Sequence, residues 1–234
     1  MKPLIPRRLR VPTLLAAALA WAVLIALGSL LSGHRKPGKL DDALGRGIDN
    51  LVGRRSRLAE VLVTPTDTLV VLAVLALLVA VGLILHRWEV AILAVAGPGI
   101  AVTIAELVLK PLFDRRIHGG LSYPSGHMVA AVSTLTVALL VVTSGARWWL
   151  RLVIAPVWAA LVVVLMVGLV AMDYHYPTDT IGGFCLSLGV ILPLALVADR
   201  VRFRDRPEIP APRVGGSGRP SWRAGSRANV TDRG

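Results

Sequence analysis

The sequence contains a single cysteine, so the chain cannot form an internal disulfide. Cys185 lies inside a long apolar run, where a small apolar core residue is the simplest interpretation. Acidic residues are also scarce, with 14 Asp and Glu against 26 Lys and Arg, and the formal net charge is +12. No nucleic-acid-binding motif accompanies these basic residues, so we expect no nucleic-acid partner.

Hydrophobic residues, in contrast, make up 55% of the chain, which is high for a soluble domain of this size. They form blocks of about 20 residues, the length that a helix needs to cross the hydrocarbon core of a membrane. The alternating pattern of a β-barrel is absent. We therefore predict an all-α polytopic membrane protein, residues 11–199, with six transmembrane helices at Val11–Leu31, Asp67–Leu85, Val90–Leu109, Met128–Thr143, Leu150–Met172 and Thr180–Ala198.

Three segments differ from these blocks in composition. Residues 1–10 are basic, and we interpret the apolar block after them as a retained anchor, because a cleaved signal peptide has a shorter apolar core. Residues 32–65 are amphipathic and predict one or two helices lying along the membrane interface. Residues 200–234 are rich in Arg, Pro, Gly and Ser, and predict a disordered basic tail.

Six transmembrane helices place both termini on one side of the membrane. The larger set of Lys and Arg, including the tail, lies on that side, so we expect it to be cytoplasmic, although the 32–65 segment is also basic. We expect a multi-pass protein of the inner (plasma) membrane. Two polar loops then face the periplasmic or extracellular side and gather Lys110, Arg115, Arg116, His118, His127, His175 and Asp179 at one membrane face.

In the first loop, Ser125 is a candidate N-cap for the helix that follows. The free N–H groups and the partial positive charge of a helix N-terminus bind anions. Gly126 allows a bound group to approach the backbone closely, and His127 stands in the first turn. An ordinary helix cap with an incidental histidine is an equally good interpretation of this segment alone.

In the second loop, Pro177 suits the first position of a helix, which puts Asp179 in its first turn. An ionised Asp179 can accept a hydrogen bond from one ring nitrogen of His175 and leave the other free as a nucleophile or base. An interfacial histidine beside a helix-capping aspartate is the alternative.

Cations accompany these groups. Lys110 is a candidate phosphate ligand, or else an interfacial lysine paired with Glu106 one turn earlier. Arg115 and Arg116 are candidates for a fork around phosphate oxygens, or else solvated loop charges. Cations, a helix N-terminus, two histidines and an aspartate at one face suit phosphoryl transfer. We expect no cofactor and no metal, because a carboxylate cluster for magnesium is absent and His118, His127 and His175 lack a familiar zinc spacing.

The sequence resembles the type 2 phosphatidic acid phosphatase (PAP2) superfamily, which includes vanadium haloperoxidases. That family's pattern is a Lys, six residues and Arg-Pro, then Pro-Ser-Gly-His, then Ser-Arg, five residues, His, three residues and Asp. Lys110, residues 124–127, His175 and Asp179 fit this order. The chain departs from it at Ile117, which replaces the first Arg, and at Gly168-Leu169, which replace Ser-Arg.

The resemblance implies that His175 is a nucleophile forming a phosphohistidine, that Asp179 orients it, and that His127 protonates the leaving group. Lys110, an arginine, Ser125 and the Gly126 N–H would hold the phosphate. We predict a metal-independent phosphatase acting on a lipid-linked phosphate or diphosphate, with Arg115 and Arg116 sharing the work of the two family arginines. The alternative is a non-catalytic lipid-phosphate-binding or assembly protein with a degenerate site, and a haloperoxidase is a distant third. The expected partners are membrane lipids and the lipid phosphate, and no feature indicates an oligomeric state.

Overall fold

Six helical segments in the computed structural model, which describes residues 3–204, are long and apolar enough to cross a membrane. They centre on the helices α1 (Arg10–Leu31), α4 (Thr68–Ile84), α5 (Trp88–Ile104), α7 (Gly126–Thr143), α8 (Trp148–Ala171) and α9 (Pro177–Arg204). These bounds match the six predicted blocks to within a few residues. The predicted all-α polytopic membrane fold is therefore confirmed.

The outer surfaces of these helices carry large apolar side chains. Leu30, Leu69 and Ile84 are 73%, 80% and 74% exposed, which suits contact with lipid and not with water. Backbone groups in such a surface must bond within their own segment, and a helix satisfies this requirement.

Helix α9 is the most buried of the six, with 56% of its apolar window inside the protein. It packs against α1, α5 and α7, and more narrowly against α8. Gly189 allows α1 to approach closely, because a side chain there would collide with the Trp21 ring, whose Nε1 donates to the Gly189 carbonyl at 3.0 Å. Gly97, in the Gly97-Pro98-Gly99 sequence of α5, makes a similar approach to Ile191 of α9.

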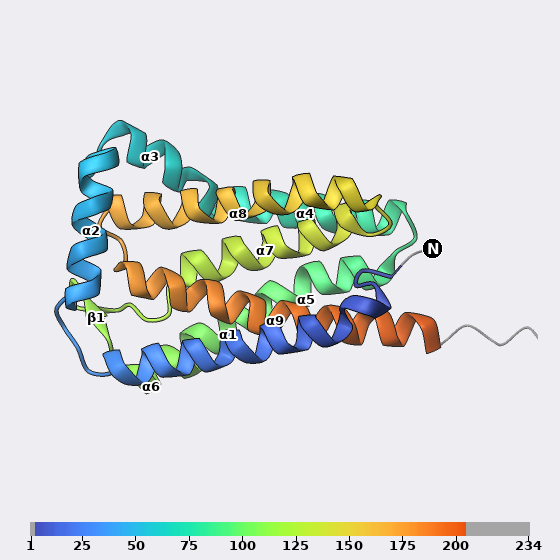
Figure 1. Ribbon diagram of the computed structural model, residues 1–234, viewed down its shortest axis with the longest axis horizontal. Coiled ribbons are helices and arrows are strands. Elements are labelled where there is room, and N and C mark those ends of the chain that lie inside the picture. Colours follow the sequence, from blue (N-terminus) through green and yellow to red (C-terminus); the bar gives the residue numbers. More distant parts are fainter. Residues whose placement is uncertain (1–2, 205–234) are drawn as a thin grey trace, which may run out of the picture.

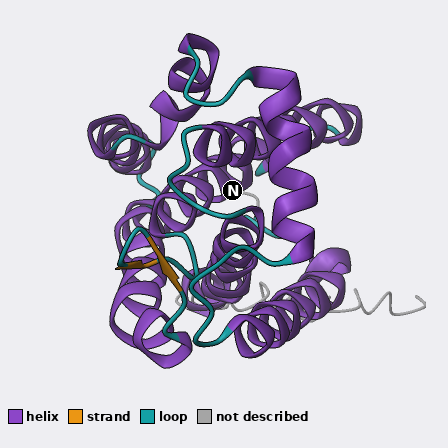
Figure 2. Ribbon diagram, turned by 90° about the vertical axis from the view of Figure 1, so that its left-hand side faces the viewer, coloured by secondary structure: helices purple, strands orange, loops and turns teal. Residues whose placement is uncertain are grey.

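Helix α2 (Lys39–Val52) lies across one end of the bundle, roughly perpendicular to the long helices (Figure 1). It is followed by α3 (Arg57–Val63), so the 32–65 segment contains two helices. The shorter elements are η1 (Arg7–Leu9), η2 (Thr64–Thr66), the π-helical turn η3 (Ala105–Leu109), α6 (Lys110–Phe113), β1 (Arg116–Ile117) and β2 (Gly120–Leu121). Viewed from that end, α2, the small β1–β2 hairpin and the loops cover the ends of the long helices (Figure 2).

The described N-terminal segment and the end of α9 lie together at the opposite end of the bundle (Figure 1). The backbone N–H groups of Leu4 and Ile5 each donate to the buried carboxylate of Asp199 at 2.9 Å. Both ends of the described chain are therefore on one side, as an even number of spans requires. Helix α9 continues to Arg204, and the rest of the predicted tail lies outside the described residues.

Candidate active site

The two predicted loops meet at the end of the bundle that α2 crosses. His127, in the first turn of α7, and His175, two residues before α9, have ring centroids 5.8 Å apart at a steep angle. A backbone hydrogen bond from Ser125 N–H to the Asp179 carbonyl, 3.0 Å long, fixes the start of α7 against the start of α9. The structure thus brings together the two histidines that the sequence placed 48 residues apart.

Ser125 is the N-cap of α7, and its hydroxyl oxygen accepts from Met128 N–H at 3.3 Å. This confirms the cap predicted from the sequence. The N-terminus of α7, at Gly126 and His127, therefore faces the region where the two loops meet, and its free N–H groups offer a site for an anion.

A carboxylate of the chain itself stands at this helix N-terminus. Glu106 pairs with Lys110 Nζ at 2.7 Å for one oxygen and 2.9 Å for the other. A Cβ added to Gly126 would collide with that same carboxylate, and the Lys110 Nζ lies 3.6 Å from the added atom. Glu106 lies on the π-helical turn that precedes Pro111, a proline that cannot donate a backbone hydrogen bond.

His175 is close to Asp179, as predicted, but it is not hydrogen-bonded to it. Its Nδ1 lies 3.9 Å from Asp179 Oδ2, and among the described residues this buried nitrogen has no hydrogen-bond partner. The side chain is only 9% exposed. A small movement of the ring toward Asp179 would close this gap and let the Nδ1–H group donate a hydrogen bond to the carboxylate.

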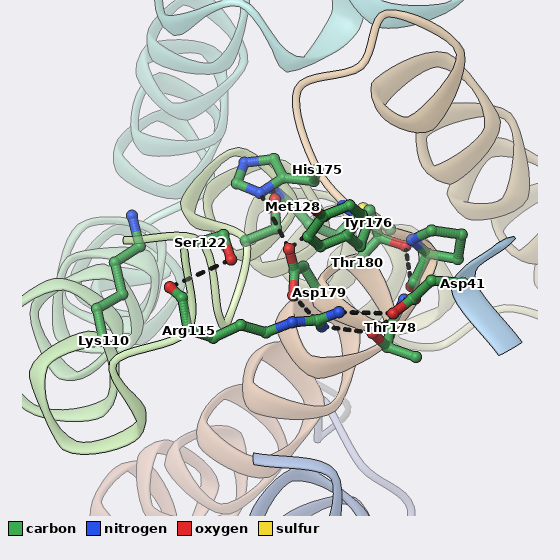
Figure 3. A network of polar contacts seen from close by, with 12 residues as sticks. Asp41, Lys110, Arg115, Ser122, Met128, His175, Tyr176, Thr178, Asp179 and Thr180 are labelled. Carbon is green, nitrogen blue, oxygen red and sulfur yellow. Dashed lines mark hydrogen bonds and ion pairs between the residues drawn. The ribbon is translucent and has the colours of Figure 1, made fainter. Parts of the chain in front are cut away.

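Asp179 is itself held by Arg115 (Figure 3). Arg115 is fully buried, and its Nη1 donates to Asp179 Oδ1 at 2.5 Å. The other Asp179 oxygen accepts from Tyr176 N–H at 3.2 Å. The same guanidinium donates to Thr178 Oγ1 and, through Nη2, to Asp41 Oδ2, both at 2.5 Å. It also stacks 4.7 Å from the centre of the Tyr176 ring, and burial raises the pKa of that phenol.

The side chains of the two neighbouring arginines therefore point in different directions. Figure 3 shows the Arg115 side chain extending away from Lys110 toward Asp41 and Thr178. Arg116 is 40% exposed and pairs with Asp114 at 2.8 Å. From the sequence we expected the two to share the work of the two family arginines. Instead, Arg115 is drawn inward by two buried carboxylates, whereas Arg116 stays at the surface of the hairpin.

The position of the family's second arginine, residue 169, lies in an apolar core. Leu169 is fully buried and packs in a core with Met128 and Val132. At Gly168, a Cβ would lie 2.7 Å from the Leu62 carbonyl carbon, so α3 crosses α8 where the family has Ser. An arginine at position 169 would place a cation in an apolar core without a partner.

Asp41, which holds the far side of Arg115, was not among the predicted site residues. Its nearest partners are remote in sequence, since Asp41 Oδ1 accepts from both the N–H and the hydroxyl of Thr178 at 3.0 and 2.8 Å. One sequence signal points to it. At helical spacing Asp41 falls on the same face as Leu44 and Ile48, where a carboxylate is out of place unless it has a partner.

An apolar groove of about 1090 Å³ runs from this site along α4 and α5. Its polar end is formed by Glu106, Lys110, Gly126, His127 and His175. A smaller polar pocket of about 470 Å³ lies under α2, and His175 borders both. Within residues 3–204, no group of three or more His, Cys, Asp or Glu is arranged to hold a metal ion.

Comparison with known proteins gives one match. A family model described as the PAP2 superfamily matches residues 72–203, just over half of the chain. Neither the curated proteins nor the solved structures gave a match.

We predict that Glu106→Gln tightens the binding of vanadate, a phosphate mimic. The carboxylate and an incoming anion would compete for Lys110 and the α7 N-terminus, and one charge-assisted hydrogen bond of about 1.5–3 kcal/mol corresponds to a gain of roughly tenfold or more. Titration of the detergent-purified protein with vanadate measures the effect. Glu60→Gln, an exposed acid on α3, is the control and should bind as wild type does. Weaker binding by Glu106→Gln would show instead that Glu106 orients Lys110 for the anion.

Proposed function

The chain belongs to the PAP2 superfamily, and from this premise we propose that it is a membrane phosphatase that removes phosphate from a lipid-linked monoester or diphosphate. Membership suggests phosphatase activity on phosphate esters, and the six spans make it a multi-pass membrane protein. The lipid substrate, the phosphohistidine intermediate and the independence from metal are the parts that we add.

The observation that carries the lipid assignment is the apolar groove. Along α4 and α5 it is lined by aliphatic side chains such as Leu72, Leu75 and Val102, and only its end at the histidines is polar. A phosphate seated at Lys110 and His127 would therefore have an apolar path leading away from it between two lipid-facing helices. This suits an acyl or isoprenoid chain, and a water-soluble ester would leave it empty.

The chemistry follows from the two histidines. His175 Nε2 attacks phosphorus while Asp179 holds the proton on Nδ1, and the bond from phosphorus to the leaving oxygen breaks as His127 protonates that oxygen. Water then attacks the phosphohistidine, His127 takes the proton, and the phosphorus–nitrogen bond breaks. Lys110, the Ser125 hydroxyl and the Gly126 N–H stabilise the phosphoryl oxygens. The products are inorganic phosphate and a lipid alcohol, or a lipid monophosphate from a diphosphate.

A second candidate rests on the cations around the site. Arg115 is engaged with Asp41 and Asp179, and Leu169 fills the position of a family arginine. A transferring phosphoryl group carries charge on three oxygens, and the cation placed beside the α7 N-terminus within residues 3–204 is Lys110, whose Nζ lies 3.6 Å from a Cβ added at Gly126. These features favour a lipid-phosphate-binding or assembly protein without turnover. The pairing of His127 with His175 and Asp179 favours the enzyme, because binding alone does not require it.

We further propose that the protein resides in the inner (plasma) membrane with the site facing outward. The greater number of basic residues on the side of the termini supports this orientation. An alkaline phosphatase reporter inserted after Gly119, at the exposed tip of the hairpin, should be active, and one inserted after Gly145, at the other end of the bundle, should be inactive. The reverse pattern would place the site in the cytoplasm.

The first test of activity is phosphate release from purified protein across a panel of phosphatidate, phosphatidylglycerophosphate, polyprenyl phosphates and phosphorylated glycolipids. We expect activity that persists in EDTA, is blocked by vanadate, and passes through an acid-labile phosphoenzyme that His175→Asn lacks. His118→Asn, which alters an exposed hairpin histidine, is the matched control and should retain both activity and phosphoenzyme. Activity that EDTA abolishes and zinc restores would refute the metal-free scheme, and vanadate binding without release on any lipid would favour the binding protein.

The second test fills the groove. Ala80 lines it on α4, and Ala80→Trp should displace part of a bound lipid chain. Loss of contact with about two methylene groups, each contributing ~0.8 kcal/mol, lowers kcat/KM for a long-chain lipid phosphate about tenfold. A short water-soluble phosphate ester should be hydrolysed as by wild type. Ala73→Trp, on the same helix but exposed outside the groove, is the control. Equal losses on both substrates would show that the groove does not hold the lipid chain.

A further inference from the structure

Three charged side chains form a buried row behind His175. Asp41, Arg115 and Asp179 have exposed side-chain fractions of 1%, 0% and 0%, and Arg115 bridges the two carboxylates through separate Nη atoms. Figure 3 shows the row running from α2 to the start of α9, with His175 beside its Asp179 end. The row is more than the aspartate–histidine pair that the family resemblance implies, because its first member comes from a helix outside the matched region.

The charge of the row matters for the imidazole. Arg115 alone would neutralise Asp179, and a neutral pair gives His175 little electrostatic support. Asp41 adds a second carboxylate, so the row has two negative charges and one positive charge, a net charge of −1. A net negative charge near an imidazole stabilises its protonated form and holds the Nδ1 proton in place.

The other titratable or charged groups that border the two pockets around His175 lie outside this row. His127, Lys110 and Glu106 border the groove. The polar pocket is bordered by His118, Asp173, Tyr176, Asp42, Asp49, Arg35, Arg46 and Arg54. None of them is hydrogen-bonded to Asp41 in the described contacts, and the Tyr176 ring is the one that stacks on the Arg115 guanidinium held by Asp41.

We propose that Asp41 and Arg115 are positioning residues that act through Asp179. Arg115 fixes one Asp179 oxygen so that the other faces His175, and Asp41 restores the negative charge that Arg115 would otherwise cancel. This inference deepens the proposed function and rests on it, because His175 is there the nucleophile.

The row also attaches α2 to the site. Asp41 Oδ2 accepts from Gly38 N–H at 3.2 Å at the start of α2, while its Oδ1 holds Thr178 in the first turn of α9. The amphipathic helix is therefore fastened directly to the segment that contains His175 and Asp179. A change at Asp41 reaches the nucleophile without touching the groove, so it should alter kcat and leave the KM for the lipid unchanged.

The experiment compares four proteins that differ in the formal charge of the row: Arg115→Gln (−2), wild type (−1), the double variant Asp41→Asn/Arg115→Gln (−1) and Asp41→Asn (0). Diethyl pyrocarbonate reacts with neutral imidazole, so the pH midpoint of His175 modification, followed by mass spectrometry, reports its protonation without any need for turnover. The midpoint should be highest in Arg115→Gln, equal in wild type and the double variant, and lowest in Asp41→Asn. Glu60→Gln, which removes an exposed charge on α3 that borders neither pocket, should behave as wild type.

The companion measurement is phosphate release. For Asp41→Asn we expect kcat to fall about tenfold, with KM within about twofold of wild type, and Asp41→Glu should recover most of the loss. The inference would be overturned if wild type and Asp41→Asn had equal midpoints, or if the midpoint of the double variant equalled that of Asp41→Asn. Asp41 would then be a structural residue.

Two further outcomes are distinguishable. Thermal melting in detergent reports whether each variant folds. If Asp41→Asn does not fold, the other three proteins still test the inference, because the modification midpoint of Arg115→Gln should lie above those of wild type and the double variant. If wild type releases no phosphate from any lipid, the proposed function fails, whereas the modification series still tests the charge row by itself.

Discussion

A carboxylate buried at a membrane face requires a positive partner and fixed hydrogen-bond donors, and Asp179 imposes this requirement on the surrounding chain. Arg115 supplies the charge, and it is itself fully buried, so it needs a second acceptor, which Asp41 provides. Asp41 in turn takes two hydrogen bonds from Thr178, in the same turn as Asp179. The hairpin, the amphipathic helix and the start of α9 are thus held together by one closed set of charges.

This arrangement explains why the site departs from the family pattern. Arg115, on the loop after Lys110, is paired with Asp179 and Asp41, and the position of the other arginine is occupied by Leu169 in an apolar core. What remains for an anion is Lys110, shared with Glu106, and the N-terminus of α7. Under the proposed function, the phosphate would therefore be held by helix N–H groups and one lysine where the family pattern has more guanidinium groups.

The sequence was sufficient for features that depend on neighbouring residues. Hydrophobic length gave the six spans, Ser125 was correctly predicted as the cap of α7, and Pro177 as the first residue of α9. Features that depend on distant contacts were different. The bond between Asp41 and Thr178 spans 137 residues, and no local pattern indicates which buried acid Arg115 will choose. The approach of α3 to Gly168 and the π-helical turn carrying Glu106 likewise follow from packing. The sequence therefore placed His175 near Asp179 and Lys110 near Glu106, but it did not indicate that Arg115 and Asp41 hold Asp179.

Helix α9 follows the other five spans in the chain, yet it contacts most of them and part of the site. It pairs with α1 along Gly189, receives the N-terminal segment at Asp199, and carries Thr178 and Asp179 in its first turn. During biosynthesis, the earlier spans enter the membrane with Arg115 and Asp41 still lacking part of their partners. The site is consequently complete only when the final span is in place, because a chain that ends before α9 lacks the Thr178 and Asp179 partners of the buried Asp41 and Arg115.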